Sequence, residues 1–198
     1  RDAQESRGLG DVYKRQSYEY PIVKIGTQYW MREDLCATAY RDGTTLNKQT
    51  QLGEGAGYFR PQNTETYLYN GEVILDGNLA PVGWRIPNSD DWQALKEYLK
   101  DDASILKSGE WEVLKEGDTI DSGSNLAGFS AYPVGIWGAG KNISQKQLVC
   151  YWTLNETENS IPEQSISFTG SSAKFSVAAT HVKNETYYKA FSIRCLKE

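Results

Sequence analysis

The sequence predicts one α+β domain in which short antiparallel strands dominate and residues 88–100 form the main helix. Two patterns predict this class. Apolar residues recur at helical spacing in this one segment, where Trp92, Leu95 and Leu99 fall on one face. Toward the C-terminus, short runs of alternating apolar residues are separated by polar breaks of turn length, which is typical of an antiparallel sheet. The 198 residues are enough to bury a core of substantial size.

The predicted helix has a clear start signal. It follows residues 80–87, which read as a turn and a short extended piece that ends in a proline. Asn88 is a favourable N-cap, because its side-chain oxygen can accept a hydrogen bond from a free backbone N–H of the first turn. Asp91 stands three residues later, where its carboxylate can reach back to the N-cap and face the positive helix end. We therefore interpret the Asp90-Asp91 pair as helix capping rather than as acid–base machinery.

The elements before the helix are short. Residues 18–30 place apolar residues on both sides of a Gly26-Thr27 turn, and this pattern predicts a β-hairpin. Three further segments follow, which we predict as one helical turn, a polar glycine-rich loop and an apolar run: 31–35, 49–63 and 67–75.

The segments after the helix are mostly extended. The sequence predicts, in chain order, a short strand, a long loop, a proline-interrupted extended piece and a flexible glycine-rich piece: 111–114, 115–125, 129–135 and 135–140. Four late strands are predicted at 148–154, 165–169, 174–180 and 187–196. Apolar neighbours place four tryptophans in the core: Trp30, Trp84, Trp92 and Trp152. Trp111 and Trp137 border polar or glycine-rich loops, where a ligand-stacking role competes with core packing.

Composition and charge argue against several classes of protein. The formal net charge is −5 and no basic stripe is present, which argues against a general nucleic-acid binder. No apolar run approaches the roughly 20 residues that a membrane-spanning helix needs. His181 is the only histidine, and the three cysteines lie too far apart for a zinc pattern, so no metal or other cofactor is predicted.

The three cysteines do not form a disulfide framework. Strand alternation puts Cys150 on the same face as Trp152, and Cys195 on the same face as Ile193. Both thiols are therefore predicted to point into the core. A disulfide between them and two buried free thiols remain alternatives, and Cys36 is left over in either case.

Residues 1–16 are treated separately from the domain, which spans 17–198. The segment ends in residues 11–16, Asp-Val-Tyr-Lys-Arg-Gln, which resemble the conceptual translation of a transposon-end adapter used to build sequencing libraries. We expect a non-native tail fused to a truncated gene, and an ordinary polar tail is the alternative. On the first interpretation the native start is missing, and with it the export signal or the lipid anchor of an exported protein.

A set of short motifs occurs in the order of one known family. The motifs are residues 25–35 (Ile-Gly-Thr-Gln-Tyr-Trp-Met-Arg-Glu-Asp-Leu), 40–44 (Tyr-Arg-Asp-Gly-Thr), 83–87 (Gly-Trp-Arg-Ile-Pro) with Asp91-Trp92, 128–133 (Gly-Phe-Ser-Ala-Tyr-Pro), 151–153 (Tyr-Trp-Thr) and 191–195 (Phe-Ser-Ile-Arg-Cys). From residue 20 to the C-terminus the chain resembles the Fibrobacter succinogenes major paralogous domain, which occurs in surface proteins and lipoproteins of Bacteroidetes and their relatives.

The segment 83–92 is also similar to the formylglycine-generating, sulfatase-modifying family and to variable proteins of diversity-generating elements. These proteins share a C-type-lectin-like fold, so the resemblance implies that architecture here. Many relatives carry a cysteine just before the Pro-x-Gly-Trp sequence of residues 81–84, where this chain has Ala80. The formylglycine-generating enzymes use a cysteine pair near the C-terminus, whereas only Cys195 lies in the terminal strand here. Their activity is therefore not inherited with the fold.

No catalytic residues are predicted. The pairs 101–102 and 156–158 read as solvated loop carboxylates, and Ser130 is not in a Gly-x-Ser-x-Gly elbow. Asn155 and Glu156 follow the Trp152 strand much as calcium ligands do in lectins, yet two oxygen-bearing residues fall short of the number that calcium requires.

The resemblance and the loops together predict a non-catalytic binding or adhesion module of the cell surface, either secreted or on the outer membrane. Its partner would be a glycan or a surface protein, contacted by loops such as 115–125 and 135–147 on a rigid scaffold. The predicted contact residues are aromatic or amide- and carboxylate-bearing: Trp137, Asn155, Glu156, Tyr187 and Tyr188. The alternatives are an enzyme of the sulfatase-modifying type and a structural subunit of a surface appendage.

Overall fold

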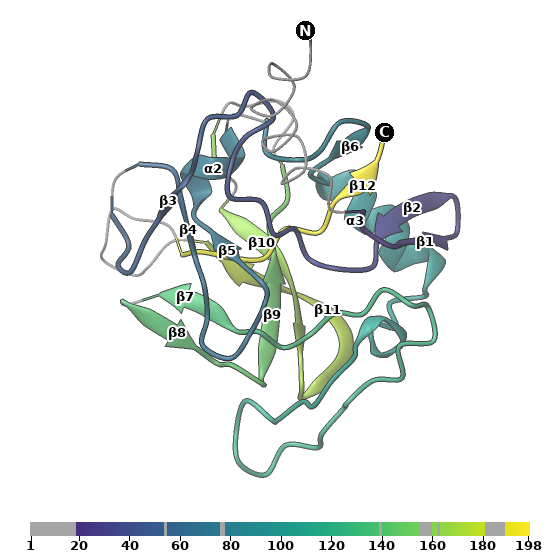
Figure 1. Cartoon of the computed structure of the whole chain (residues 1–198). Coiled ribbons are helices and arrows are strands. Elements are labelled where there is room, and N and C mark those ends of the chain that lie inside the picture. The colour runs from purple at the N-terminus through teal and green to yellow at the C-terminus, as the bar shows by residue number, and fades with distance from the viewer. Residues whose placement is uncertain are drawn as a thin grey trace, which may run out of the picture.

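The computed structural model describes residues 19–53, 55–75, 78–138, 140–154, 160–161, 163–180 and 189–198. Within these ranges the chain forms four small sheets and one helix longer than two turns, so the organisation consists mostly of strands with few helices. Figure 1 shows the three-stranded sheet β9–β10–β11 at the centre, with hairpin β1–β2 on one side and hairpin β7–β8 on the other. The predicted tail, residues 1–16, lies outside the described residues.

The first sheet joins the two ends of the domain. Its strand order is β1-β2-β12-β6, and all neighbours are antiparallel: β1 Ile22–Ile25, β2 Gln28–Met31, β12 Leu196–Lys197 and β6 Trp84–Arg85. The predicted hairpin is confirmed, and Gly26 at its turn has a φ of 61°, a left-handed value that glycine adopts without strain. The C-terminal strand therefore holds the N-terminal hairpin against the Trp84 segment.

The second sheet is antiparallel, as the late alternating runs predict. Its order is β11-β10-β9, with the strands Ser172–Ala179, Gln164–Thr169 and Leu148–Tyr151. The predicted strand at 187–196 is only partly described. Its described part makes single bridges from residues 190–192 to three different partners before β12 begins.

Two small sheets lie partly in segments that the sequence predicts as irregular. One consists of β3 Asn47–Lys48, β4 Gly57–Phe59 and β5 Leu68–Tyr69, and the other of β7 Ile136–Gly138 and β8 Lys141–Ile143. The loop prediction for 49–63 is therefore wrong at β4, and the flexible segment predicted at 135–140 is wrong at β7. A Cβ on Gly135 would lie 2.4 Å from a backbone oxygen of β8, so the glycine permits a close approach rather than flexibility.

Two further local predictions are wrong for a shared reason. The segment 31–35 forms no helical turn, because Met31 N–H donates to Cys195 O (3.0 Å) and Leu35 N–H donates to Ile193 O (2.8 Å). The segment 111–114 forms no strand, because its amides bond single acceptors in separate places rather than one partner strand. Acceptors from distant parts of the chain thus bind the N–H groups that a local helical turn or strand would have used.

The predicted main helix is confirmed as α3, Ser89–Tyr98. Asn88 is its N-cap and forms a reciprocal capping box with Asp91, whose N–H donates to the Asn88 side chain at 2.8 Å and whose carboxylate accepts from Asn88 N–H at 2.8 Å. Arg85 donates to both carboxylate oxygens of the same aspartate, one of them at 2.7 Å. The capping interpretation of Asp91 is confirmed. Two shorter helical pieces accompany α3: α2 Gly71–Leu75 and the 3-10 turn η1 Ser104–Leu106.

The core is built around large aromatic side chains. Trp92 of α3 lies 4.8 Å from Trp30 and 5.6 Å from Tyr151, between ring centroids, and Phe129 and Phe168 approach it edge-on. A second cluster contains Trp152, Phe191 and the thiols of Cys150 and Cys195. Core positions are thus confirmed for three of the four predicted tryptophans, whereas Trp84 is only half-buried.

Trp111 is buried in the core region despite its polar neighbours in the sequence. Its indole N–H donates to Ser108 O at 2.9 Å, and the Lys107 ammonium lies 4.9 Å from its ring centroid. The ligand-stacking alternative for Trp111 is therefore wrong. Within the described ranges, no helix is both long enough and apolar enough to cross a bilayer.

Candidate functional site

A groove of about 450 Å³ lies between helix α3 and the strands β10 and β11 of the three-stranded sheet. Helix α3 contributes one wall, with Ser89, Gln93 and Lys96. Strands β10 and β11 contribute the opposite wall, whose apolar residues are Ile166, Phe175 and Val177. The size falls within the range of small-ligand sites in proteins.

Two buried polar atoms belong to side chains that line this groove. The indole Nε1 of Trp92 and the hydroxyl of Thr153 have no hydrogen-bond partner among the described residues. Trp92 is 1% exposed and Thr153 is 5% exposed, so bulk water does not solvate either group freely. An unpartnered buried donor or hydroxyl is costly, about 1–3 kcal/mol, and such groups are rare in native structures.

The apolar residues of the sheet wall form one continuous strip. Ile166 and Val177 are cross-strand partners, and Phe175 lies two residues before Val177 on the same face of β11. Val177 is 60% exposed, which is high for an aliphatic side chain in a strand. The groove therefore combines a partly exposed apolar strip with amide and hydroxyl groups.

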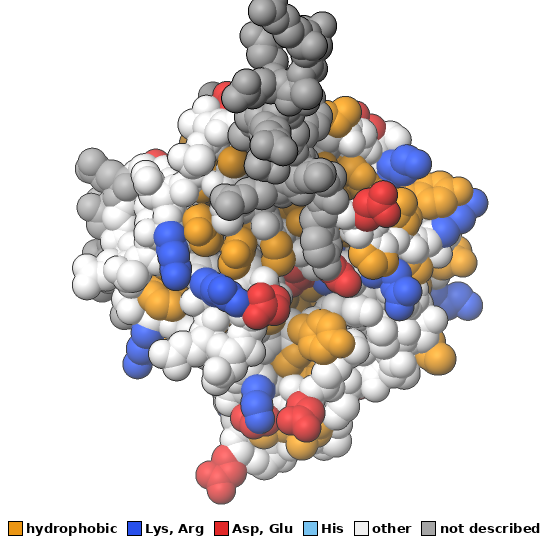
Figure 2. Space-filling view, viewed as in Figure 1, with side chains coloured by type: hydrophobic (Ala, Val, Ile, Leu, Met, Phe, Trp, Pro, Cys, Tyr) orange, Lys and Arg blue, Asp and Glu red, His pale blue; other side chains and the backbone are white. Residues whose placement is uncertain are grey.

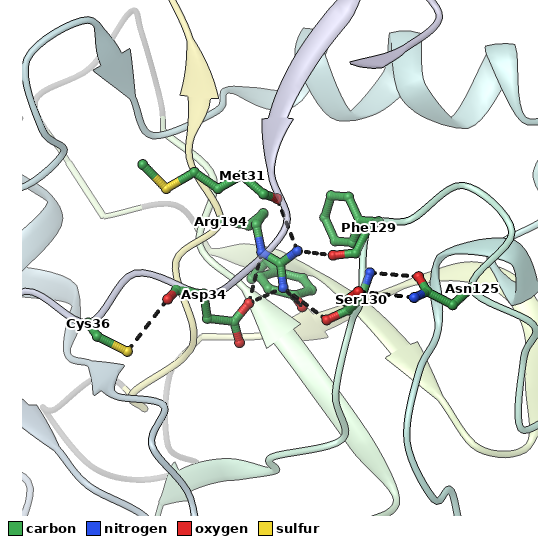
Figure 3. A network of polar contacts seen from close by, with 8 residues as sticks. Met31, Asp34, Cys36, Asn125, Phe129, Ser130 and Arg194 are labelled. Carbon is green, nitrogen blue, oxygen red and sulfur yellow. Dashed lines mark hydrogen bonds and ion pairs between the residues drawn. The ribbon is translucent and has the colours of Figure 1, made fainter. Parts of the chain in front are cut away.

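A second polar centre lies around Arg194, and Figure 3 shows its contacts. The buried guanidinium pairs with the buried Asp34 carboxylate, with Nε to Oδ1 at 2.9 Å and a second bond from Nη2. Its other N–H groups donate to the backbone oxygens of Met31 (3.2 Å), Phe129 and Ser130 (3.2 Å). The guanidinium also lies 4.3 Å from the Phe129 ring centroid. This centre is satisfied by the protein itself, which indicates a structural rather than a catalytic role.

A cavity of about 490 Å³ opens beside this centre, and Cys36 is among its lining residues. The Cys36 thiol donates to Glu65 O at 3.1 Å. Cys36 is exposed as a residue, yet burial of its sulfur and the nearby Asp34 carboxylate raise the pKa of the thiol to about 11. Because the thiolate is the nucleophile, this thiol is poorly suited to covalent catalysis near neutral pH.

The other two cysteines are buried free thiols, which decides between the two alternatives that alternation left open. Burial raises the pKa of the Cys150 and Cys195 thiols to about 12. Within the described ranges, no group of three or more His, Cys, Asp or Glu side chains could hold a metal ion. On the face shown in Figure 2, acidic and basic side chains are interspersed with hydrophobic ones.

We expect iodoacetamide to modify Cys36 in the folded chain about tenfold more slowly at pH 8 than in urea. A pKa raised from 9.0 to about 11 lowers the thiolate fraction about a hundredfold, and the stronger nucleophilicity of the more basic thiolate recovers about one order of magnitude. The rate for the folded chain should rise about tenfold per pH unit from pH 8 to pH 10, because the thiolate fraction does. Peptide mass spectrometry measures the rate, and rapid modification at pH 7 would contradict this account.

The family model described as the Fibrobacter succinogenes major domain matches residues 23–197. The chain belongs to this family. No curated protein and no solved structure matches this chain.

The motifs on which the resemblance in the sequence rests occupy mainly scaffold positions in the structure. Arg85 and Asp91 form the ion pair that fixes the start of α3, and Arg194 forms the buried centre with Asp34. Two motif residues stand apart from this pattern. Trp92 and Thr153 line the groove and carry its unpartnered polar atoms.

Of the sequence-predicted contact residues, only Trp137 lies among the described residues, and it does not line the groove. Trp137 is half-buried in β7 of the major domain, stacks on Phe59 with centroids 4.9 Å apart and pairs with Ala190 through two backbone hydrogen bonds of 3.0 Å. The other four predicted contact residues lie outside the described residues: Asn155, Glu156, Tyr187 and Tyr188. Sequence reasoning missed the sheet wall, although the alternation of Phe175 and Val177 on one strand face was a usable signal.

Proposed function

We propose that this major domain is a non-catalytic binding module of the cell surface, secreted or held at the outer membrane, which recognises a glycan or a surface protein. The observation that carries the proposal is the groove between α3 and β10–β11, where unpartnered polar atoms lie beside a partly exposed apolar strip. Few polar groups placed within an apolar surface are the usual composition of a recognition site.

The chemistry of the described thiols supports contact rather than reaction. A covalent mechanism of the sulfatase-modifying type needs a reactive cysteine, and the raised pKa values of Cys36, Cys150 and Cys195 keep all three protonated near neutral pH. The Arg194–Asp34 pair is committed to holding three chain segments together. These groups are therefore poor candidates for nucleophile, base or acid.

We further propose that the scaffold is C-type-lectin-like. The arrangement that supports this proposal is a capped helix introduced by the Gly83-Trp84 turn, together with a late antiparallel sheet and a C-terminal strand that pairs with the N-terminal hairpin. On such a scaffold, the sequences of loops and exposed sheet faces can vary while the core residues stay the same.

The test is a screen of the full chain against immobilised glycans and extracellular proteins, with Val177→Asp and Trp137→Ala as paired variants. Val177 is exposed in the groove wall and Trp137 is half-buried in β7, so the two variants separate the groove from the sequence-predicted loop surface. We expect a binding partner whose binding is lost in Val177→Asp. Loss in Trp137→Ala alone would contradict the choice of the groove as the binding site.

A second arm tests the alternative class of function. The chain is incubated with a cysteine-containing peptide of the kind that sulfatase-modifying enzymes convert, and the product is examined by mass spectrometry. We expect the peptide to stay unchanged. Conversion of its cysteine to formylglycine would overturn the proposal of a non-catalytic module.

A further inference from the structure

The polar residues of the groove indicate a ligand rich in hydroxyl groups. Ser89, Gln93, Gln164 and Ser176 contribute hydroxyls and amides, which can both donate and accept hydrogen bonds. A sugar hydroxyl also donates and accepts, so it can match such groups in either direction. A peptide backbone, in contrast, presents donors and acceptors in a fixed alternation.

The charge of the groove favours an uncharged ligand. Lys96 is the only charged residue among the described lining residues, and its ammonium lies 3.7 Å from the Asp101 carboxylate. An anionic sugar would have to compete with Asp101 for this cation, and a cationic ligand would meet no carboxylate among the described lining residues.

The apolar strip matches the apolar C–H faces of a sugar ring. A pyranose carries hydroxyls around its edge and C–H groups on its faces. Ile166, Val177 and Phe175 offer a continuous apolar surface on which such a face can lie, next to the polar helix wall. At about 450 Å³, the groove has room for one ring with its neighbours continuing into solvent.

Hydrogen bonds to the two unpartnered atoms should contribute most to the free energy of ligand binding. The Trp92 indole N–H can donate to a ligand oxygen, and the Thr153 hydroxyl can donate or accept. Both atoms are buried, so a ligand in the groove reaches them only when wall side chains shift. The described lining side chains that are long and flexible enough to shift are those of Gln93, Lys96 and Gln164.

We infer that the groove between α3 and β10–β11 holds one uncharged pyranose ring, whose hydroxyls contact Trp92 and Thr153 and whose C–H face lies on the Ile166–Val177–Phe175 strip. This inference rests on the proposed binding function and narrows its partner from a glycan or a protein to a neutral glycan.

The experiment titrates methyl glycosides of glucose, galactose, mannose and N-acetylglucosamine into the ¹⁵N-labelled full chain. The six tryptophans give separate indole N–H resonances, and the one missing in Trp92→Phe identifies Trp92. We expect at least one glycoside to shift the Trp92 resonance more than the other five. An unshifted Trp92 resonance under saturating glycoside overturns the assignment of this ring to the groove.

Thr153→Val and Ser192→Ala form a matched pair of variants. Both residues carry a buried hydroxyl without a partner among the described residues, and of the two, Thr153 lines the groove and Ser192 does not. Removing either hydroxyl should raise the melting temperature of the ligand-free chain, by about 2–4 °C, because an unsatisfied polar group is replaced by an apolar one. Glycoside affinity should fall about tenfold in Thr153→Val and stay unchanged in Ser192→Ala. Equal affinities in the two variants overturn the inference.

Val177→Asp provides a second test that does not depend on a buried substitution. Its side chain is 60% exposed, so the fold tolerates the change, and a carboxylate on the strip should weaken glycoside binding more than tenfold. Failure of the inference is distinguishable from failure of the proposed function. Binding to immobilised glycans that Val177→Asp leaves intact overturns the groove assignment alone, and binding to proteins but to no glycan overturns the neutral-glycan inference alone.

Discussion

Replacing Arg194 by methionine is expected to lower the free energy of unfolding by about 3–5 kcal/mol, the usual cost of removing one partner from a buried ion pair. Arg194 is 1% exposed and Asp34 is 7% exposed, so the substitution leaves an uncompensated carboxylate in the core. It also removes the donors that the backbone oxygens of Met31, Phe129 and Ser130 accept from. Urea unfolding followed by tryptophan fluorescence measures the change.

Two further variants separate the charge from the geometry of this centre. Arg194→Lys keeps the charge but cannot reach Asp34 and three backbone oxygens with one ammonium group, so it should lose most of the same stability. The double variant Arg194→Met with Asp34→Leu should recover part of the loss, because no unpaired carboxylate is left. A single variant Arg194→Met within about 1 kcal/mol of the parent chain would show that this centre does not hold the domain together.

Local signals in the sequence predict the elements whose hydrogen bonds are local. The hairpin around Gly26 and the helix that begins after Asn88 are determined by a turn and a capping box within a few residues. The Arg194 centre could not be predicted in this way. Its carboxylate partner, Asp34, lies 160 residues earlier in the chain. No sequence pattern near Arg194 indicates that the two side chains pair.

The same limit explains the errors in the short elements and the missed site. Strand β4 exists because Gly57 pairs with Asn47 and Tyr58 with Tyr69, and each pairing depends on a segment outside the local window. Likewise, the sequence predicts Trp92 as a core residue, which is correct, but not that its indole N–H lacks a partner. That property depends on which β10 and β11 side chains approach α3, and these strands follow more than seventy residues later.

Trp92→Ala is the second substitution with a large expected effect, a loss of about 3–5 kcal/mol in the free energy of unfolding. The ring of Trp92 has centroid contacts with Trp30, Tyr151, Phe129 and Phe168, so its removal opens a cavity where several segments meet. These contacts join the strands β2, β9 and β10 to helix α3.

Trp84→Ala is the matched control, because the residue type is the same and the side chain is only half-buried at the end of β6. Its loss should stay below about 2 kcal/mol, since less apolar surface returns to water and less of a cavity forms. Trp92→Phe keeps an aromatic ring in the cluster and should fall between the two alanine variants. Equal losses for Trp92→Ala and Trp84→Ala in urea unfolding would mean that the aromatic cluster around α3 is not the main source of stability, and the groove would then lack the rigid wall on which recognition depends.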